Sequence, residues 1–230
     1  MAPIFEEFEK DKDRRFTKDE QYVSDCLSAI NEVEDLYKQL NQSIYFLTNF
    51  RTTKNLKNVG ITRFDYIVYN VESYLYRVTG ILDRVLILCN VVYNIGLLDK
   101  QCTIPKFFES GKDNDPCKII KNSNPVFFAK LNDLKDLIGR YSNKRNEIVH
   151  RKRYYDESIR VAELLNIVIE SNNTTHDKLE AFKHRRSVEQ NQVTAAFKKE
   201  FHSFNTQIRD SLDSIYTDIE VIFNTVKATL

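Results

Sequence analysis

The chain has 230 residues, enough for one large domain or two small ones, of which 42% are hydrophobic and 29% charged, as in globular proteins rather than disordered ones. Its 5 Gly and 4 Pro are too few for a turn-rich sheet fold. The net charge of +1 excludes a global excess of positive charge that would attract nucleic acid, so such a role needs a local cluster.

The four cysteines are far apart and include no C-x-x-C pair, which argues against a disulfide framework and against a zinc site. Cys26 and Cys89 sit among apolar residues at helical spacing, where a free cysteine behaves as a small core residue. Residues 1–15 are highly charged and lack the apolar core of a signal peptide, and no run approaches 18 apolar residues. We therefore expect a soluble, cytoplasmic protein with no membrane partner.

Two long helices are predicted in the first hundred residues. Thr17 and Glu20 have the spacing of a capping box, and apolar residues then recur every three or four positions, which predicts a helix over 17–50. A second apolar stripe predicts a helix from near Thr62 to Val92, broadly apolar and therefore central. Gly96 is the expected residue just past its end.

Residues 97–124 break the helical pattern and predict a long excursion with one short helical turn at 106–108. Asn124 and Pro125 then look like a cap followed by proline in the first helical position. The stripe that follows continues through Tyr141. Further helices are predicted over 157–170 and, with sustained three-to-four spacing, over 187–228.

Sustained period-two alternation is absent from the chain, so the predicted fold is all-α: an up-and-down helical bundle of four to five long helices. No internal repeat and no long linker is evident. The expected organisation is a single domain over residues 1–230.

One short segment carries the chemistry. Arg145, Asn146 and His150 set a permanent cation, an amide and an imidazole with a pKa near neutrality within two helical turns. Between Arg140 and Arg153 there are six Lys or Arg and one Glu, a local charge of +5 in a nearly neutral protein. These residues suit the binding of a phosphodiester and the movement of protons around it.

In this segment the sequence resembles the HEPN family, helical bundles whose signature is an Arg, four to six residues and then a His, usually with a polar residue just after the Arg. The resemblance is specific over residues 140–155 and architectural over about 62–170. It implies that the family core is about 62–170 and that the helices at 17–50 and 187–228 are elaborations. It also implies metal-independent cleavage of RNA at a composite site between two protomers, and a role as a toxin or anti-phage effector, for which an antitoxin would be a partner.

The residue types agree with that implication. RNA transesterification needs a base for the ribose 2′-hydroxyl and an acid for the leaving 5′-oxygen, and imidazole can serve as either. One His150 per chain makes only half of such a pair, so a homodimer is expected. Arg145 would stabilise charge on the phosphoryl oxygens and Asn146 would orient the imidazole or the phosphate, with no metal and no cofactor. The residues expected to bind RNA are Lys144, Arg151, Lys152, Arg153, Tyr154 and Tyr155.

Other interpretations of the same residues stay open. Tyr141 falls on the helix stripe, which favours packing in the core, and the basic residues from Arg151 to Arg153 could simply complement a helix C-terminus. Glu147 and His150 also have the E-x-x-H spacing of di-iron bundles, but a second such pair is missing from the sequence. The serious alternative function is a non-catalytic helical interaction protein, whose first and last helices dimerise or bind a partner helix.

Overall fold

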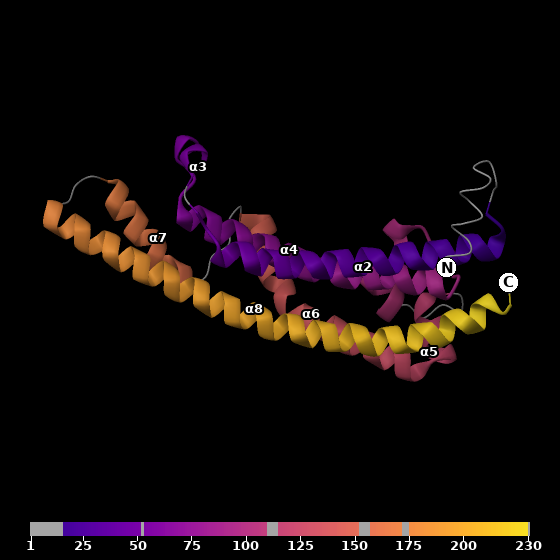
Figure 1. The fold of residues 1–230 in the computed structure, drawn as a ribbon. Coiled ribbons are helices and arrows are strands. Elements are labelled where there is room, and N and C mark those ends of the chain that lie inside the picture. The colour runs from indigo at the N-terminus through magenta and orange to yellow at the C-terminus, as the bar shows by residue number, and fades with distance from the viewer. Residues whose placement is uncertain (1–15, 52, 110–114, 152–156, 172–174, 230) are drawn as a thin grey trace. The chain divides into compact units, whose positions relative to one another are not determined.

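The computed structural model describes residues 16–51, 53–109, 115–151, 157–171 and 175–229 (Figure 1). These residues form helices and no β-strand, so the prediction of an all-α fold is confirmed. Four helices have between 27 and 52 residues and account for most of the chain. In order, the elements are α2 (Lys18–Thr48), α3 (Lys54–Asn58), α4 (Arg63–Val92), η1 (Asp99–Gln101), η2 (Pro105–Glu109), α5 (Pro116–Ser123), α6 (Pro125–Arg151), α7 (Glu157–Glu170) and α8 (His176–Lys227).

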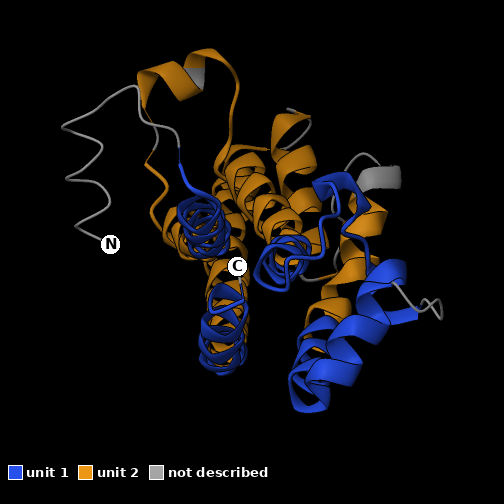
Figure 2. Cartoon of the chain, turned by 90° about the vertical axis from the view of Figure 1, so that its right-hand side faces the viewer, with its two compact units in different colours: residues 1–35, 81–135, 211–230 blue, residues 36–80, 136–210 orange. Residues whose placement is uncertain are grey.

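The chain divides into two compact units, coloured separately in Figure 2. Unit 1 comprises residues 1–35, 81–135 and 211–230, and unit 2 comprises 36–80 and 136–210. Each of the four long helices therefore contributes one part to each unit, while α7 belongs to unit 2 alone. The expectation of a single domain over 1–230, with a core at about 62–170, stays a prediction.

Unit 1 is held by contacts between the start of α2 and the end of α4. The Tyr22 hydroxyl donates to the carbonyl oxygen of Val92 at 2.8 Å, and Arg84 pairs with Glu32 at 2.8 Å. Because the partner number in α4 falls as the number in α2 rises, the two helices run antiparallel here. Tyr22 also stacks on Phe223 of α8, with ring centroids 5.5 Å apart. All four cysteines of the chain are in this unit, and all are free and buried, as expected for Cys26 and Cys89.

Unit 2 is built around an aromatic and amide network. Tyr74 of α4 stacks on Phe201 of α8 with centroids 3.7 Å apart, and its hydroxyl donates to Asn205 Oδ1 at 2.7 Å. Asn205 is only 2% exposed, and its Nδ2 donates to Asn41 Oδ1 of α2 at 2.9 Å. Since a buried amide without partners would be costly, these bonds fix how the three helices pack. A further bond joins α6 to α8, in which Arg140 Nη1 donates to Gln207 Oε1 at 3.3 Å.

Two of the predicted helix starts, those of α2 and α6, are confirmed at atomic detail. At α2, the Thr17 backbone amide donates to Glu20 Oε2 at 2.9 Å and the Glu20 amide donates to Thr17 Oγ1 at 3.3 Å, which is a reciprocal capping box. At α6, the Phe127 amide donates to Asn124 Oδ1 at 3.0 Å, with Pro125 as the first helical residue. Both signals are local in sequence, so no tertiary contact was needed to predict them.

The predicted stop of α4 was placed two residues too late. Asn94, not Gly96, is the left-handed residue just past the helix, with φ of 51°. The Ile95 amide donates to the Asn90 carbonyl at 3.0 Å and the Asn94 amide to the Val91 carbonyl at 2.9 Å, the two bonds of a Schellman motif. Asparagine tolerates this backbone conformation better than most residues, so the helix ends at Asn94, before the chain reaches Gly96. Gly96 also has a positive φ, of 80°, but lies in the loop beyond.

Two further boundaries differ from the sequence prediction. The last helix, α8, begins at His176 rather than at 187, because the residues between are good helix formers without an apolar stripe to mark them. The 97–124 excursion contains three short helical elements, η1, η2 and α5, where one turn at 106–108 was expected. That turn lies within η2, and α5 was missed because eight residues are too short for periodicity to detect.

Candidate functional site

The segment from Arg145 to His150 occupies the last turns of α6, in unit 2. Arg145 and Asn146 are exposed, and Arg145 Nη1 donates to Asn146 Oδ1 at 3.2 Å. Positions 146 and 150 are four residues apart and so share one face of the helix. The His150 backbone is helical, and its side chain lies outside the described part of the structure.

Two buried side chains anchor these turns of α6. Tyr141 is 6% exposed and Ile148 is 5% exposed, and their spacing of seven residues puts both on the inner face of the helix. The Tyr141 ring meets Phe204 of α8 edge-on, with centroids 4.5 Å apart. The expectation that Tyr141 packs in the core is therefore confirmed. Its packing leaves Arg145 and Asn146 facing solvent.

Glu200 of α8, which no sequence pattern singles out, contacts the side chains of these turns. The Tyr141 hydroxyl donates to Glu200 Oε1 at 2.6 Å, and Lys144 Nζ lies 3.8 Å from the same oxygen. Burial, and then the bond to the carboxylate, raise the pKa of Tyr141, so it remains a neutral donor at physiological pH. Lys144 Nζ also lies 5.6 Å from the centre of the Tyr141 ring. Because this ion pair is partly exposed, it orients Lys144 more than it stabilises the fold.

Among the expected residues, Arg145 and Asn146 are in contact, and Lys144 lies one position earlier in the same helix. The other expected residues are placed only in part. The side chain of Arg151 lies outside the described residues, although its backbone ends α6, and Lys152, Arg153, Tyr154 and Tyr155 lie outside them entirely. Their expected roles in binding RNA stay predictions, as do the catalytic roles of Arg145, Asn146 and His150.

The next helix, α7, presents apolar side chains on two faces. Ile159, Ala162 and Leu165 are buried, as in any amphipathic helix. The outer face is also apolar, which is unusual for a surface helix. It forms what we call the α7 stripe, whose members are 37% to 57% exposed: Val161, Leu164, Ile167 and Val168.

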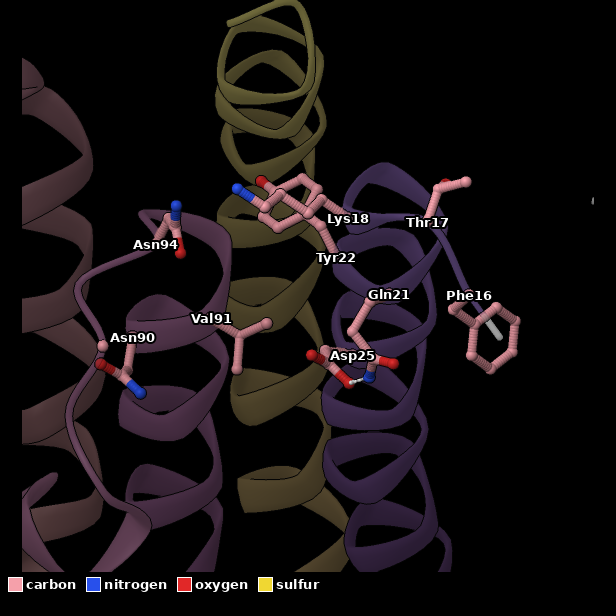
Figure 3. A pocket seen from close by; sticks show the side chains of 10 residues that line it. Phe16, Thr17, Lys18, Gln21, Tyr22, Asp25, Asn90, Val91 and Asn94 are labelled. Atoms are coloured by element: carbon pink, nitrogen blue, oxygen red, sulfur yellow. Dashed lines mark hydrogen bonds between the residues drawn. The ribbon is translucent and has the colours of Figure 1, made fainter. Parts of the chain in front are cut away.

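A pocket of about 520 Å³ opens in unit 1, between the start of α2 and the end of α4 (Figure 3). Two of its amide side chains are bonded within the protein. Gln21 Nε2 donates to Asp25 Oδ1 at 2.7 Å, a bond drawn in Figure 3. The Asn90 carboxamide both donates to and accepts from the Leu97 backbone at 2.9 Å. The bonds of Asn90 hold the loop after the Schellman turn in place, and this loop lines the pocket.

Within the described residues, no group of three or more His, Cys, Asp or Glu side chains is arranged to hold a metal ion. Among the same residues, none of the helices combines the length and the apolar composition needed to cross a bilayer.

Comparison with known proteins gave one match. Neither the curated proteins nor the solved structures included one that matched this chain. A family model described as HEPN_Cthe2314-like HEPN matches residues 26–227, which is most of the chain and includes α4, α6, α7, α8 and all but the first eight residues of α2. The all-α fold and the Arg-Asn-x-x-x-His segment at the end of α6 agree with that match, and the chain belongs to the HEPN family.

Proposed function

We propose that the protein is a metal-independent endoribonuclease whose site is formed by the ends of α6 from two copies of the chain. The observation that carries the proposal is the Arg-Asn-x-x-x-His segment in a HEPN protein, with Arg145 and Asn146 exposed to solvent. Lys144 and Arg145 add positive charge at the same helix end, as binding of a phosphodiester requires. The substrate is RNA, since the reaction uses the ribose 2′-hydroxyl.

The proposed reaction is an internal transesterification. The 2′-oxygen attacks the adjacent phosphorus while its proton passes to one imidazole, and the bond to the 5′-oxygen breaks as a second imidazole protonates that oxygen. The products are a 2′,3′-cyclic phosphate and a 5′-hydroxyl. Arg145 stabilises the charge that builds on the non-bridging oxygens, and Asn146 orients the imidazole or the phosphate.

Two observations support a homodimer. The reaction needs a base and an acid, and the segment contains one histidine, so a second copy supplies the other. The α7 stripe follows the segment directly in the chain and belongs to the same unit. Its four exposed apolar side chains are the kind that a protein interface covers.

The decisive experiment measures cleavage of single-stranded RNA in EDTA. Wild-type protein should cleave, and His150→Ala should reduce the rate by about 10²–10⁴-fold, because it removes both the acid and the base of the dimeric site. His202→Ala is the matched control, since His202 is an exposed histidine elsewhere in unit 2. Lack of cleavage of every RNA tested, or full activity in His150→Ala, would favour the alternative of a non-catalytic helical interaction protein.

A second experiment tests the composite site. Wild-type and His150→Ala chains with different affinity tags are co-expressed, and the mixed dimer is purified through both tags. A composite site needs both imidazoles, so the mixed dimer should be nearly inactive. Two independent sites would instead leave about half of the wild-type activity, which would exclude the shared site while retaining the nuclease.

The family resemblance also leads us to propose a biological role as a toxin or anti-phage effector with an antitoxin partner. Expression of the wild-type chain in bacteria should then arrest growth, and His150→Ala should relieve the arrest. Arrest by both chains alike would show that toxicity does not come from RNA cleavage.

A further inference from the structure

Unit 2 contains a second pocket, of about 720 Å³, formed where the start of α4 meets α7 and α8. Pockets of 300–1,000 Å³ are of the size that holds small molecules. We call it the arginine pocket. The side chains that matter for the argument are Phe50, Arg63, Asn166, Arg186, Ser187 and Gln190.

Both arginines are bonded to neutral partners. Arg63 Nη2 donates to Asn191 Oδ1 at 2.7 Å, and Arg186 Nη1 donates to Asn166 Oδ1 at 3.2 Å. Among the described residues, neither guanidinium has a carboxylate partner. A carboxamide orients a guanidinium without cancelling its charge, and each guanidinium retains further N–H donors. The pocket therefore contains two oriented guanidinium groups whose positive charge is not neutralised by a carboxylate of any described residue.

Arg185, next to Arg186 on α8, instead has a carboxylate partner. Arg185 is 66% exposed, and its Nε lies 3.7 Å from Glu189 Oε1, one turn along the helix. Neither residue lines the pocket. Asp65, two residues after Arg63, accepts hydrogen bonds from the Thr62 amide at 3.0 Å and the Thr62 hydroxyl at 2.6 Å. Asp65 thus caps α4 and is not among the lining residues.

The remaining lining suits a ligand with both a polar and a flat apolar part. Gln190 is only 4% exposed and is also among the lining residues. Phe50 contributes an aromatic surface, and its ring is held 4.9 Å from that of Tyr66. Ser187 adds an exposed hydroxyl at the rim.

We propose that the arginine pocket binds a phosphorylated nucleotide, with the phosphate between Arg63 and Arg186 and the base against Phe50. Guanidinium groups bind phosphate oxygens through paired donors, and aromatic rings stack on bases of any sequence. The nucleotide comes either as a free molecule or as one unit of an RNA strand. The pocket lies outside the Arg145–His150 segment, so the proposal holds whether or not that segment cleaves RNA.

The test is equilibrium binding of two probes, AMP and a fluorescent ten-nucleotide single-stranded RNA, at fixed salt. The RNA has 2′-O-methyl riboses, which lack the attacking hydroxyl, so the protein cannot cleave it during the measurement. Arg63→Gln and Arg186→Gln should each weaken binding by about tenfold or more, because each removes a charged donor from the phosphate. Arg185→Gln is the matched control and should bind as wild type. Weakened binding of AMP identifies a free nucleotide as the ligand, and weakened binding of the RNA alone identifies a strand.

The base contact is tested separately with Phe50→Leu. This variant should lose affinity for AMP or for the RNA and retain its affinity for inorganic pyrophosphate, which has no base to stack. If His150→Ala abolished binding of AMP while Arg63→Gln and Arg186→Gln did not, the nucleotide would belong to the α6 segment and not to the arginine pocket.

A measurement on the wild-type chain covers the case in which a variant fails to fold. Phenylglyoxal modifies exposed arginines, and peptide mass spectrometry locates the modified positions. A saturating probe should protect Arg63 and Arg186 and leave Arg185 reactive. The proposal is overturned if wild type binds neither probe, if Arg63→Gln and Arg186→Gln bind as tightly as wild type, or if Arg185→Gln weakens binding equally.

Discussion

The two pockets differ in what their polar groups are bonded to. In unit 1, the carboxamides of Gln21 and Asn90 bond neighbouring protein groups. In unit 2, Arg63 and Arg186 are held by neutral amides and keep their charge. Unit 2 also contains the Arg145–His150 segment, whereas unit 1 contains all four buried cysteines. The comparison teaches that a hollow of similar size is structural or functional according to how its polar groups are satisfied.

The largest expected contrast between the units is in RNA cleavage. Arg145→Ala should slow cleavage by about 10²–10³-fold, since it removes the donor that stabilises charge in the transition state. Arg84→Ala is the control in unit 1, because Arg84 is similarly exposed but paired with Glu32. Rates on one RNA, together with melting temperatures, check the pair. Equal losses in the two variants would break the assignment of function to unit 2.

The next effect concerns the stability of unit 2. Asn205→Ala should lower the free energy of unfolding by about 2–4 kcal/mol, because it leaves Tyr74 and Asn41 without their buried partner. Urea denaturation provides the measurement. Thr206→Ala, next to it on the exposed side of α8, should stay within about 0.5 kcal/mol of wild type. A loss below 1 kcal/mol at Asn205 would mean that stacking, not the amide network, holds the helices.

A smaller effect is expected at the turn that ends α4 in unit 1. Asn94→Ala should destabilise the protein by about 1 kcal/mol, because alanine resists the left-handed backbone at φ of 51°. Asn94→Gly should match or exceed wild-type stability, since glycine adopts this conformation freely. Thermal unfolding of both variants tests the pair, and the opposite order would show that the Asn94 side chain, and not its backbone, matters.

The smallest effect is on pH dependence through the buried thiols of unit 1. Burial raises the pKa of the Cys26 thiol from 9.0 to about 11, so folding favours the protonated form. This contribution to stability is complete below about pH 8.5 and is lost as the pH rises through 11. The wild type should therefore lose more stability between pH 9 and 11 than Cys26→Ser does. Parallel curves from urea titrations of the two proteins would contradict this assignment.

Local signals in the sequence were reliable guides to structure. Thr17 with Glu20, and Asn124 with Pro125, marked helix starts because each pair acts within one turn. The start of α8 at His176 was missed because charged helix formers carry no periodicity. At the site, Arg145, Asn146 and His150 are close in sequence and were found together. Glu200 lies 59 residues from Tyr141, and Arg63 lies far from Arg186 in the chain, so only the fold could bring each pair together.

The contact between Tyr141 and Glu200 has an evolutionary consequence. A buried phenol and a carboxylate 2.6 Å apart depend on each other, because loss of either leaves the other poorly satisfied. The two positions should therefore change together among relatives, phenylalanine at 141 accompanying an uncharged residue at 200. Lys144 lies 3.8 Å from the same carboxylate, so the residue at position 144 should vary more freely among relatives once that change has occurred. Paired substitutions at positions 141 and 200 among family members would then show how the end of α6 is anchored to α8.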